Sequence, residues 1–113
     1  MDRVHEFVYF KVFDKNWARL GLTDDDLIFL EKTIMENPNG GELIQGTGGL
    51  RKMRFALPHT GKSSGARVLY VDFISYEHTA VLDVYAKNEQ ISLTDREKQA
   101  YKEAINIYLK GLR

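Results

Sequence analysis

The sequence predicts an α+β fold, a small antiparallel sheet with two N-terminal helices and a C-terminal helix packed on one of its faces. Three observations predict it: apolar runs with strand character, apolar residues at helical spacing behind capping signals, and the order of these segments along the chain. The 113 residues suit one domain, residues 1–113, with a single modest core. An apolar fraction of 43% beside a charged fraction of 28% is typical of a chain that folds.

The N-terminal segment predicts a strand followed by a short helix. Residues 5–13 are rich in aromatic and β-branched types, which favour a strand. Residues 14–20 then place Trp17 and Leu20 on one side of a helix, and Gly21 ends it.

A second helix and three strands occupy the middle of the chain. Thr23 has the character of an N-cap, and the three aspartates that follow suit the positive end of a helix dipole. The sequence NPNGG at 37–41 ends this helix. Three consecutive strands, predicted to be antiparallel, follow at 50–57, 67–74 and 80–87, with a loop at 58–66 and a turn at 75–78 between them.

The last element is a helix that runs almost to the end of the chain. Thr94 and Glu97 have the spacing of a capping box, which satisfies two backbone donors at a helix start. One apolar face follows at helical spacing, formed by Ala100, Tyr101, Ala104, Ile105, Tyr108, Leu109 and Leu112.

Composition excludes several classes of site. Without cysteine the chain has no disulfides, no thiol chemistry and no cysteine zinc site, and its three histidines are scattered, so we expect no metal and no cofactor. No apolar run approaches the ~20 residues that span a bilayer, and the N-terminus lacks the pattern of a signal peptide. We therefore expect a cytoplasmic protein without a membrane partner.

The charge is zero overall but unevenly distributed. Residues 1–49 hold five basic and nine acidic side chains, whereas residues 50–88 hold six basic and three acidic ones. The middle of the chain is therefore its basic part, and it contains the first candidates for a functional site.

Alternation along the predicted strands gathers cations on one face. Lys52 and Arg54 share a face opposite Met53 and Phe55, while Arg51, at the strand end, points the other way on strict alternation but can turn to either side.

The next two strands add to this group. Arg67 opens one of them, and in the other Leu82, Val84 and Ala86 are predicted on one face and Asp83, Tyr85 and Lys87 on the opposite one. Lysine and arginine on the solvated face of a half-buried sheet are also ordinary, so this pattern alone leaves both readings open.

Glycines flank the basic strand. Gly48 and Gly49 precede it, and a backbone without a Cβ atom approaches an anion closely, which makes both candidates for substrate binding. The loop sequence HTGKSSG at 59–65 contributes Lys62 as a further candidate. It is not a nucleotide P-loop, because position 56 is alanine and a strand, not a helix, is predicted to follow.

Three blocks of sequence carry a resemblance to a known family. GTGGLRKMRF at 46–55, GKSSGARVLYV at 61–71, and VYAKNE at 84–89 followed by LTDREK at 93–98 occur in this order. They resemble the HigB branch of the RelE-like toxins, the toxin halves of bacterial type II toxin–antitoxin pairs. The resemblance implies a microbial-ribonuclease-like fold. It also implies an endoribonuclease that cleaves messenger RNA, often on the ribosome.

The resemblance also implies partners and site residues. The partners are a cognate antitoxin, usually a helix-turn-helix protein, and the ribosome with its message; operator DNA is bound only through the antitoxin complex. The implied catalytic residues are Arg51, Lys52, Arg54, Arg67, Tyr85 and Lys87, with Asn88 beside the substrate.

Metal-free cleavage of RNA suits these residue types. The ribose 2′-OH attacks the adjacent phosphorus, so charge builds on the phosphate oxygens, and arginine offers a planar fork for two of them. Arginine cannot release its proton, so the general base must be another group. The candidates are Lys52, Lys87, His59 and Glu89, and the sequence does not choose among them.

Two other functions fit the same residues. One is a catalytically silent interaction module of the RelE fold, whose basic face only docks an acidic partner segment. The other is gyrase inhibition of the ParE type, within the same superfamily. The neutral charge indicates weak binding to free RNA, so a nuclease of this sequence depends on the ribosome to hold its message.

Overall fold

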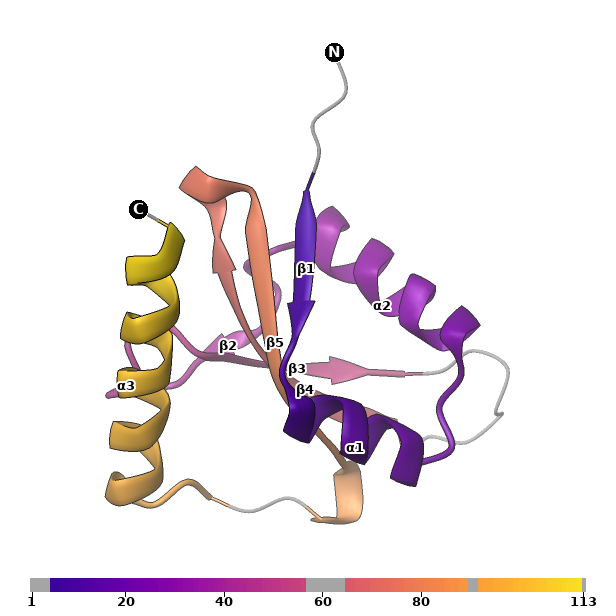
Figure 1. Ribbon diagram of the computed structural model, residues 1–113. Helices are drawn as coiled ribbons and strands as arrows, with labels where there is room; N and C mark the ends of the chain where they lie inside the picture. Colours follow the sequence, from indigo (N-terminus) through magenta and orange to yellow (C-terminus); the bar gives the residue numbers. More distant parts are fainter. Residues whose placement is uncertain (1–4, 57–64, 90–91, 113) are drawn as a thin grey trace.

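A computed structural model of the chain describes residues 5–56, 65–89 and 92–112 (Figure 1). The α+β fold class predicted from the sequence is confirmed. The elements are, in chain order, β1 (Glu6–Tyr9), α1 (Lys11–Arg19), α2 (Asp24–Glu36), β2 (Glu42–Leu43), β3 (Arg51–Phe55), β4 (Ala66–Phe73), the 3₁₀ turn η1 (Ile74–Tyr76), β5 (His78–Ala86), the 3₁₀ turn η2 (Lys87–Glu89) and α3 (Asp95–Leu112).

One five-stranded sheet has the order β1-β5-β4-β3-β2. The three middle strands pair antiparallel as predicted, and β2, a two-residue strand that the sequence did not signal, pairs antiparallel with the start of β3. β1 pairs parallel to β5, so the first strand of the chain lies beside the last. β4 therefore lies in the middle of the sheet, between β3 and β5.

The helices cover both faces of this sheet, and the expectation of one covered face was wrong. α1 and α2 pack on one face, where Phe13 and Leu30 meet Val68, and α3 packs on the other, where Ile105 meets Leu69 and Leu50. Figure 1 shows α3 on the opposite side of the sheet from α2. The physical reason lies in β4, whose successive residues from Val68 to Val71 are all buried, as expected of a strand with both faces covered.

The first strand is shorter than predicted. β1 ends at Tyr9, and the segment from Lys11 to Phe13 is the first turn of α1. Helical spacing places Phe13 and Trp17 on one face, with ring centroids 5.2 Å apart, and both are buried against the sheet. Tertiary packing of these two aromatic rings thus overrides the strand preference of residues 11–13.

The predicted N-cap at Thr23 and the predicted capping box at Thr94 are both confirmed, and Thr23 is itself part of a capping box. At the start of α2, the Asp26 backbone N–H donates to the Thr23 hydroxyl at 3.1 Å, and the Thr23 N–H donates to the Asp26 carboxylate at 2.9 Å. At the start of α3, Glu97 and Thr94 make the same two bonds at 3.1 and 2.9 Å. These contacts fix where both helices begin.

Candidate active site

Cross-strand register aligns charged and polar residues, with one leucine among them, in two parallel rows on the face that α3 covers. In the first, Arg54 lies opposite Arg67, and Arg67 lies opposite Tyr85. We call these three residues the arginine row. The second row, two residues further along each strand, is Lys52, Leu69 and Asp83. Leu69 packs in the cluster beneath α3, which identifies the face.

An irregularity in β5 contributes to the second row. Leu69 pairs with Asp83, but Tyr70 pairs with Val81, so β5 carries one extra residue, Leu82, at this point. Leu82 is therefore buried in the cluster beneath α3, while Val84 packs on the opposite face. The prediction that Leu82 and Val84 share a face was wrong, because a bulge breaks the alternation on which it depended.

Two cavities adjoin the rows. The first, of about 490 Å³, we call the arginine cavity; its lining includes Thr33, Asn37, Gly40, Glu42, Lys52, Met53, Arg54 and Arg67. The second, of about 620 Å³, we call the tyrosine cavity; its lining includes Asn16, Arg19, Leu43, Ile44, Leu69, Asp83, Tyr85, Glu89, Leu93, Glu97, Lys98 and Tyr101, together with Lys52 and Glu42. Because Lys52 and Glu42 line both, the two cavities are neighbours.

Burial keeps the two phenols of the tyrosine cavity protonated. Burial raises the pKa of the Tyr85 hydroxyl, the positive charge of Arg67 opposes the rise, and the negative charge of Asp83 adds to it. Burial, followed by the charges of Asp83 and Glu97, raises the pKa of Tyr101 to about 12. Both hydroxyls therefore carry a proton at neutral pH and are available as hydrogen-bond donors.

A hydrogen-bonded network holds Asp83 from the side of α1. The Asn16 amide donates to Asp83 Oδ1 at 2.7 Å, and the Val84 backbone N–H donates to the same oxygen at 2.8 Å. Arg19 Nε donates to the Asn16 amide oxygen at 3.2 Å. Asp83 is thus a fixed carboxylate at the edge of the site.

The same network involves Glu89, a candidate proton acceptor. The two terminal nitrogens of the Arg19 guanidinium donate to the two carboxylate oxygens of Glu89, each at 2.9 Å. These hydrogen bonds, followed by one from the Ala86 backbone N–H, lower the pKa of Glu89. A carboxylate with both oxygens engaged and a lowered pKa is a weak base, so this geometry argues against Glu89 in that role.

Arg51 does not join the arginine row. It lies opposite Tyr70 in the sheet, and its guanidinium donates to the Gly41 carbonyl at 2.8 Å. Because Arg51 and Lys52 are successive residues of β3, their side chains leave opposite faces. This position gives Arg51 a structural contact with the turn before β2.

The comparison with protein families is decisive for identity. The model of the family described as RelE toxin of the RelE/RelB toxin–antitoxin system matches residues 7–112. The chain belongs to the RelE toxin family. Among solved structures, it is similar to a mutant of the Escherichia coli toxin RelE in the free state, with 17% identity and a TM-score of 0.48, over 73% of this chain and 82% of that one.

The remaining site candidates of this RelE-family chain lie apart from the rows. Lys87 and Asn88 are exposed in η2, just past the last paired residue of β5, where the Lys87 N–H donates to the Gly65 carbonyl at 3.3 Å. Lys62 and His59 lie outside the described residues.

The flanking glycines have a conformational explanation. Gly48 and Gly49 adopt φ values of +76° and +121°, which side chains other than glycine rarely tolerate. A Cβ atom on Gly48 would lie 3.4 Å from the Lys102 side chain of α3. These glycines let the loop before β3 turn beneath α3, and that need accounts for them without a bound anion.

Several residues of the site carried weak sequence signals. The sequence signal for Asp83 is a single carboxylate within an otherwise apolar stretch of the strand. Tyr101 lay on the apolar stripe of the last helix, where a core role was the natural interpretation. Asn16 and Arg19 belong to α1, far from β5 in the chain, so only the fold brings them to Asp83.

Within residues 5–56, 65–89 and 92–112, no helix is long and apolar enough to cross a membrane. The same ranges contain no group of three or more histidine, cysteine, aspartate or glutamate side chains placed to hold a metal ion.

Proposed function

We propose that this chain is the HigB-like toxin of a type II toxin–antitoxin pair. In this proposal it is a metal-independent endoribonuclease that cleaves messenger RNA bound to the ribosome. The observation that carries the proposal is the cross-strand pair of Arg54 and Arg67 at the wall of the arginine cavity, with Tyr85, which lines the neighbouring tyrosine cavity, opposite Arg67 in the sheet. Two guanidinium groups on adjacent strands present two planar forks to one ligand, and a phosphodiester is the ligand that such forks suit.

The reaction assigned to these residues is an internal transfer. The 2′-oxygen of the ribose forms a bond to phosphorus and gives its proton to a base, while the bond from phosphorus to the 5′-oxygen of the next nucleotide breaks. A 2′,3′-cyclic phosphate forms, and the departing 5′-oxygen takes up a proton. Arg54 and Arg67 stabilise the negative charge that builds on the phosphate oxygens. This stabilisation is largest when the donors are already held in place before the reaction.

The proton transfers need two further groups. Tyr85 is paired with Arg67 and keeps its proton, so it suits protonation of the leaving oxygen. Among the candidate acceptors within the described residues, Lys52 alone lines the arginine cavity with both arginines. We assign the acceptor role to Lys52 and give Lys87 and Asn88, at the end of β5, a role in holding the RNA.

The partners follow from the family and from the charge. Toxins of the RelE family pair with an antitoxin, and we propose that this one is a helix-turn-helix protein that carries the complex to operator DNA. A neutral chain attracts free RNA weakly, so the ribosome presents the message, and the site of action is the cytoplasm.

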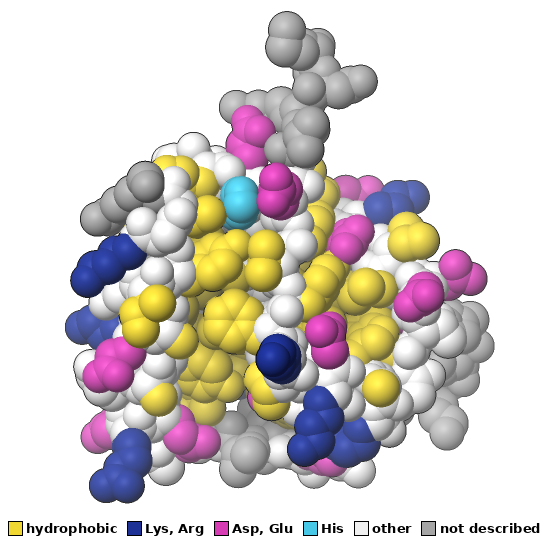
Figure 2. Space-filling model, in the orientation of Figure 1, with side chains coloured by type: hydrophobic (Ala, Val, Ile, Leu, Met, Phe, Trp, Pro, Cys, Tyr) yellow, Lys and Arg dark blue, Asp and Glu magenta, His cyan; other side chains and the backbone are white. Residues whose placement is uncertain are grey.

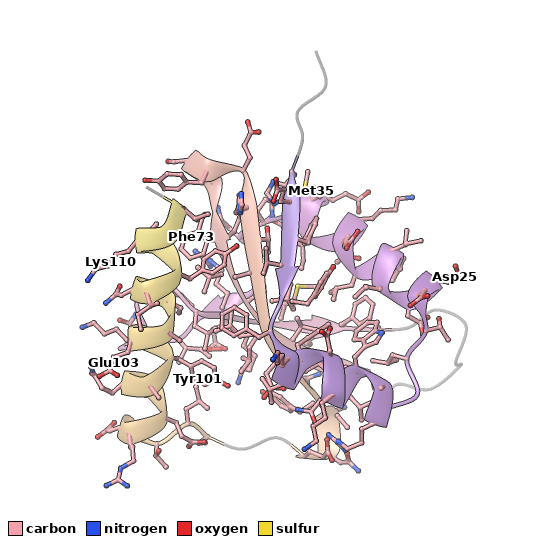
Figure 3. The ribbon with its side chains drawn as sticks, viewed as in Figure 1. Asp25, Met35, Phe73, Tyr101, Glu103 and Lys110 are labelled. Atoms are coloured by element: carbon pink, nitrogen blue, oxygen red, sulfur yellow. The ribbon has the colours of Figure 1, made fainter. Side chains whose placement is uncertain are left out.

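The first experiment is primer extension on messages translated in a cell-free system. Wild-type protein should cut within codons only when ribosomes are present. Arg67→Ala should reduce cleavage on the order of 10²-fold, because a fixed donor to the developing charge is lost. Lys110→Ala, on the outer side of α3 in Figure 3, is the matched control and should cut like wild type.

Arg67→Lys separates a nuclease from a silent module. The lysine keeps the positive charge but not the planar guanidinium fork. A phosphate clamp should therefore lose most of its RNA cleavage, whereas a docking surface should keep its binding to an acidic partner. Folded wild-type protein that makes no cuts would overturn the proposal. A gyrase supercoiling assay would then test the ParE-like alternative.

A further inference from the structure

The tyrosine cavity has a different chemistry from the arginine cavity beside it. Its wall carries two phenols, Tyr85 and Tyr101, and, among its carboxylates, Asp83 is the partly buried one, whereas Glu42, Glu89 and Glu97 are exposed. We propose that it is a nucleobase subsite that accepts a base bearing an amino group, adenine, cytosine or guanine, in preference to uracil. This inference rests on the proposed function and adds a base selectivity to it.

Asp83 supplies the discriminating contact. Asn16 and the Val84 N–H both bond to Oδ1, so the carboxylate cannot turn freely, and Oδ2 is the oxygen those contacts leave for a ligand. An ionised carboxylate only accepts hydrogen bonds. The amino groups of adenine, cytosine and guanine donate to such an oxygen, whereas the O4 carbonyl that uracil presents at the position of the cytosine amino group is an acceptor and meets it unfavourably.

The tyrosines supply flat surfaces for the ring of the base. Tyr101 points from α3 toward the sheet in Figure 3, and Tyr85 lies in the arginine row beneath. Hydrophobic surface fills the hollow between α3 and the sheet in Figure 2. Stacking of bases on aromatic side chains is a general mode of single-strand recognition and tolerates every base, so selectivity must come from a polar neighbour such as Asp83.

The two rows also fix the direction in which a nucleotide lies. Asp83 is two residues from Tyr85 along β5, a separation of about 7 Å between rows. A negative carboxylate repels a phosphate, and a pair of arginines attracts one. The phosphate therefore lies at the arginine row and its base lies toward Asp83, with Lys52 and Glu42 between the two cavities.

The alternative is that Asp83 only anchors α1 through Asn16 and that both tyrosines only pack. Asp83→Asn tests this, because the amide oxygen still accepts from Asn16 and Val84 while the other atom becomes a donor. Asp25→Asn, the same change at an exposed site on α2 far from the cavity, is the matched control.

The experiment is a titration of the purified toxin with AMP, CMP, GMP and UMP, in which the NMR signals of the tyrosine rings report binding. We expect wild type and Asp25→Asn to bind the three amino-bearing nucleotides at least 10-fold more tightly than UMP. Asp83→Asn should lose this preference and gain affinity for UMP. Equal binding of all four nucleotides, binding of none of them, or a preference that survives in Asp83→Asn would overturn the inference.

Cleavage of messages that differ in one base of the ribosome-bound codon adds a second readout. The same loss of selectivity is expected among the cuts made by Asp83→Asn. If Asp83→Asn abolished cleavage but left nucleotide preference unchanged, Asp83 would act in proton transfer and base recognition by Asp83 would be wrong. Nucleotide binding without any cleavage by wild type would overturn the proposed nuclease and leave the subsite standing.

Discussion

The hydroxyl of Tyr70 shows how one buried group holds the turn in front of the site. Tyr70 is fully buried, and its hydroxyl donates to the Pro38 carbonyl at 2.7 Å and accepts from the Gly41 N–H at 3.1 Å. We expect Tyr70→Phe to lower the free energy of unfolding by about 1–3 kcal/mol, because two backbone groups lose their partner. Urea denaturation measures this loss.

The control for Tyr70 is another tyrosine of the same sheet region. Tyr76 lies in η1 with 38% of its surface exposed, so Tyr76→Phe should change the free energy of unfolding very little. Equal effects of the two substitutions would show that the Tyr70 hydroxyl does not stabilise the turn.

At the residue scale, alternation predicted the site only as far as the strands were regular. Lys52 and Arg54 share a face as the pattern in β3 required, and Arg51 leaves the other face. Asp83 and Tyr101 were assigned to faces of their elements but not to a site, because their place in the tyrosine cavity depends on where α1 and α3 pack, which has no local signature.

At the scale of elements, the capping box of α2 has a measurable effect. Thr23 and Asp26 exchange two hydrogen bonds at the helix start. Thr23→Ala removes one acceptor and should lower the free energy of unfolding by about 1 kcal/mol. Thermal and urea unfolding both report it.

The control for Thr23 is a threonine inside the same helix. Thr33 donates only to the Phe29 carbonyl one turn back, and alanine is the better helix former, so Thr33→Ala should be neutral or slightly stabilising. A loss at position 33 as large as at position 23 would contradict a specific role of the cap.

Elements with local signals were predicted well, and those that depend on distant contacts were not. The N-cap of α2, the capping box of α3 and the three consecutive strands needed only short windows of sequence. The end of β1 depends on the burial of Phe13 against the sheet, and the position of α3 on the opposite face depends on β4 having two buried faces. Both are tertiary properties that no short window contains.

At the scale of the whole molecule, the cationic site belongs to a chain without net charge. Acidic residues of α2 offset the basic strand in the net charge, so the chain as a whole attracts RNA weakly at long range. The proposed site attracts the phosphate backbone through a few contacts, chiefly from Arg54 and Arg67 with Lys52 beside them. Few contacts mean a shallow dependence of binding on salt.

This shallow dependence is the last prediction. With two to three phosphates neutralised, single-stranded RNA should lose about tenfold in affinity between 50 and 200 mM salt, and Arg54→Ala should reduce the slope of log K against log salt by about 0.7. Fluorescence anisotropy with a 2′-O-methyl RNA oligonucleotide, whose blocked 2′-oxygen cannot attack phosphorus, measures both without cleavage. Lys110→Ala should leave the slope unchanged. A loss of a thousandfold, or equal slopes for wild type and Arg54→Ala, would mean that RNA binds a different surface, because only contacts to phosphate release counterions.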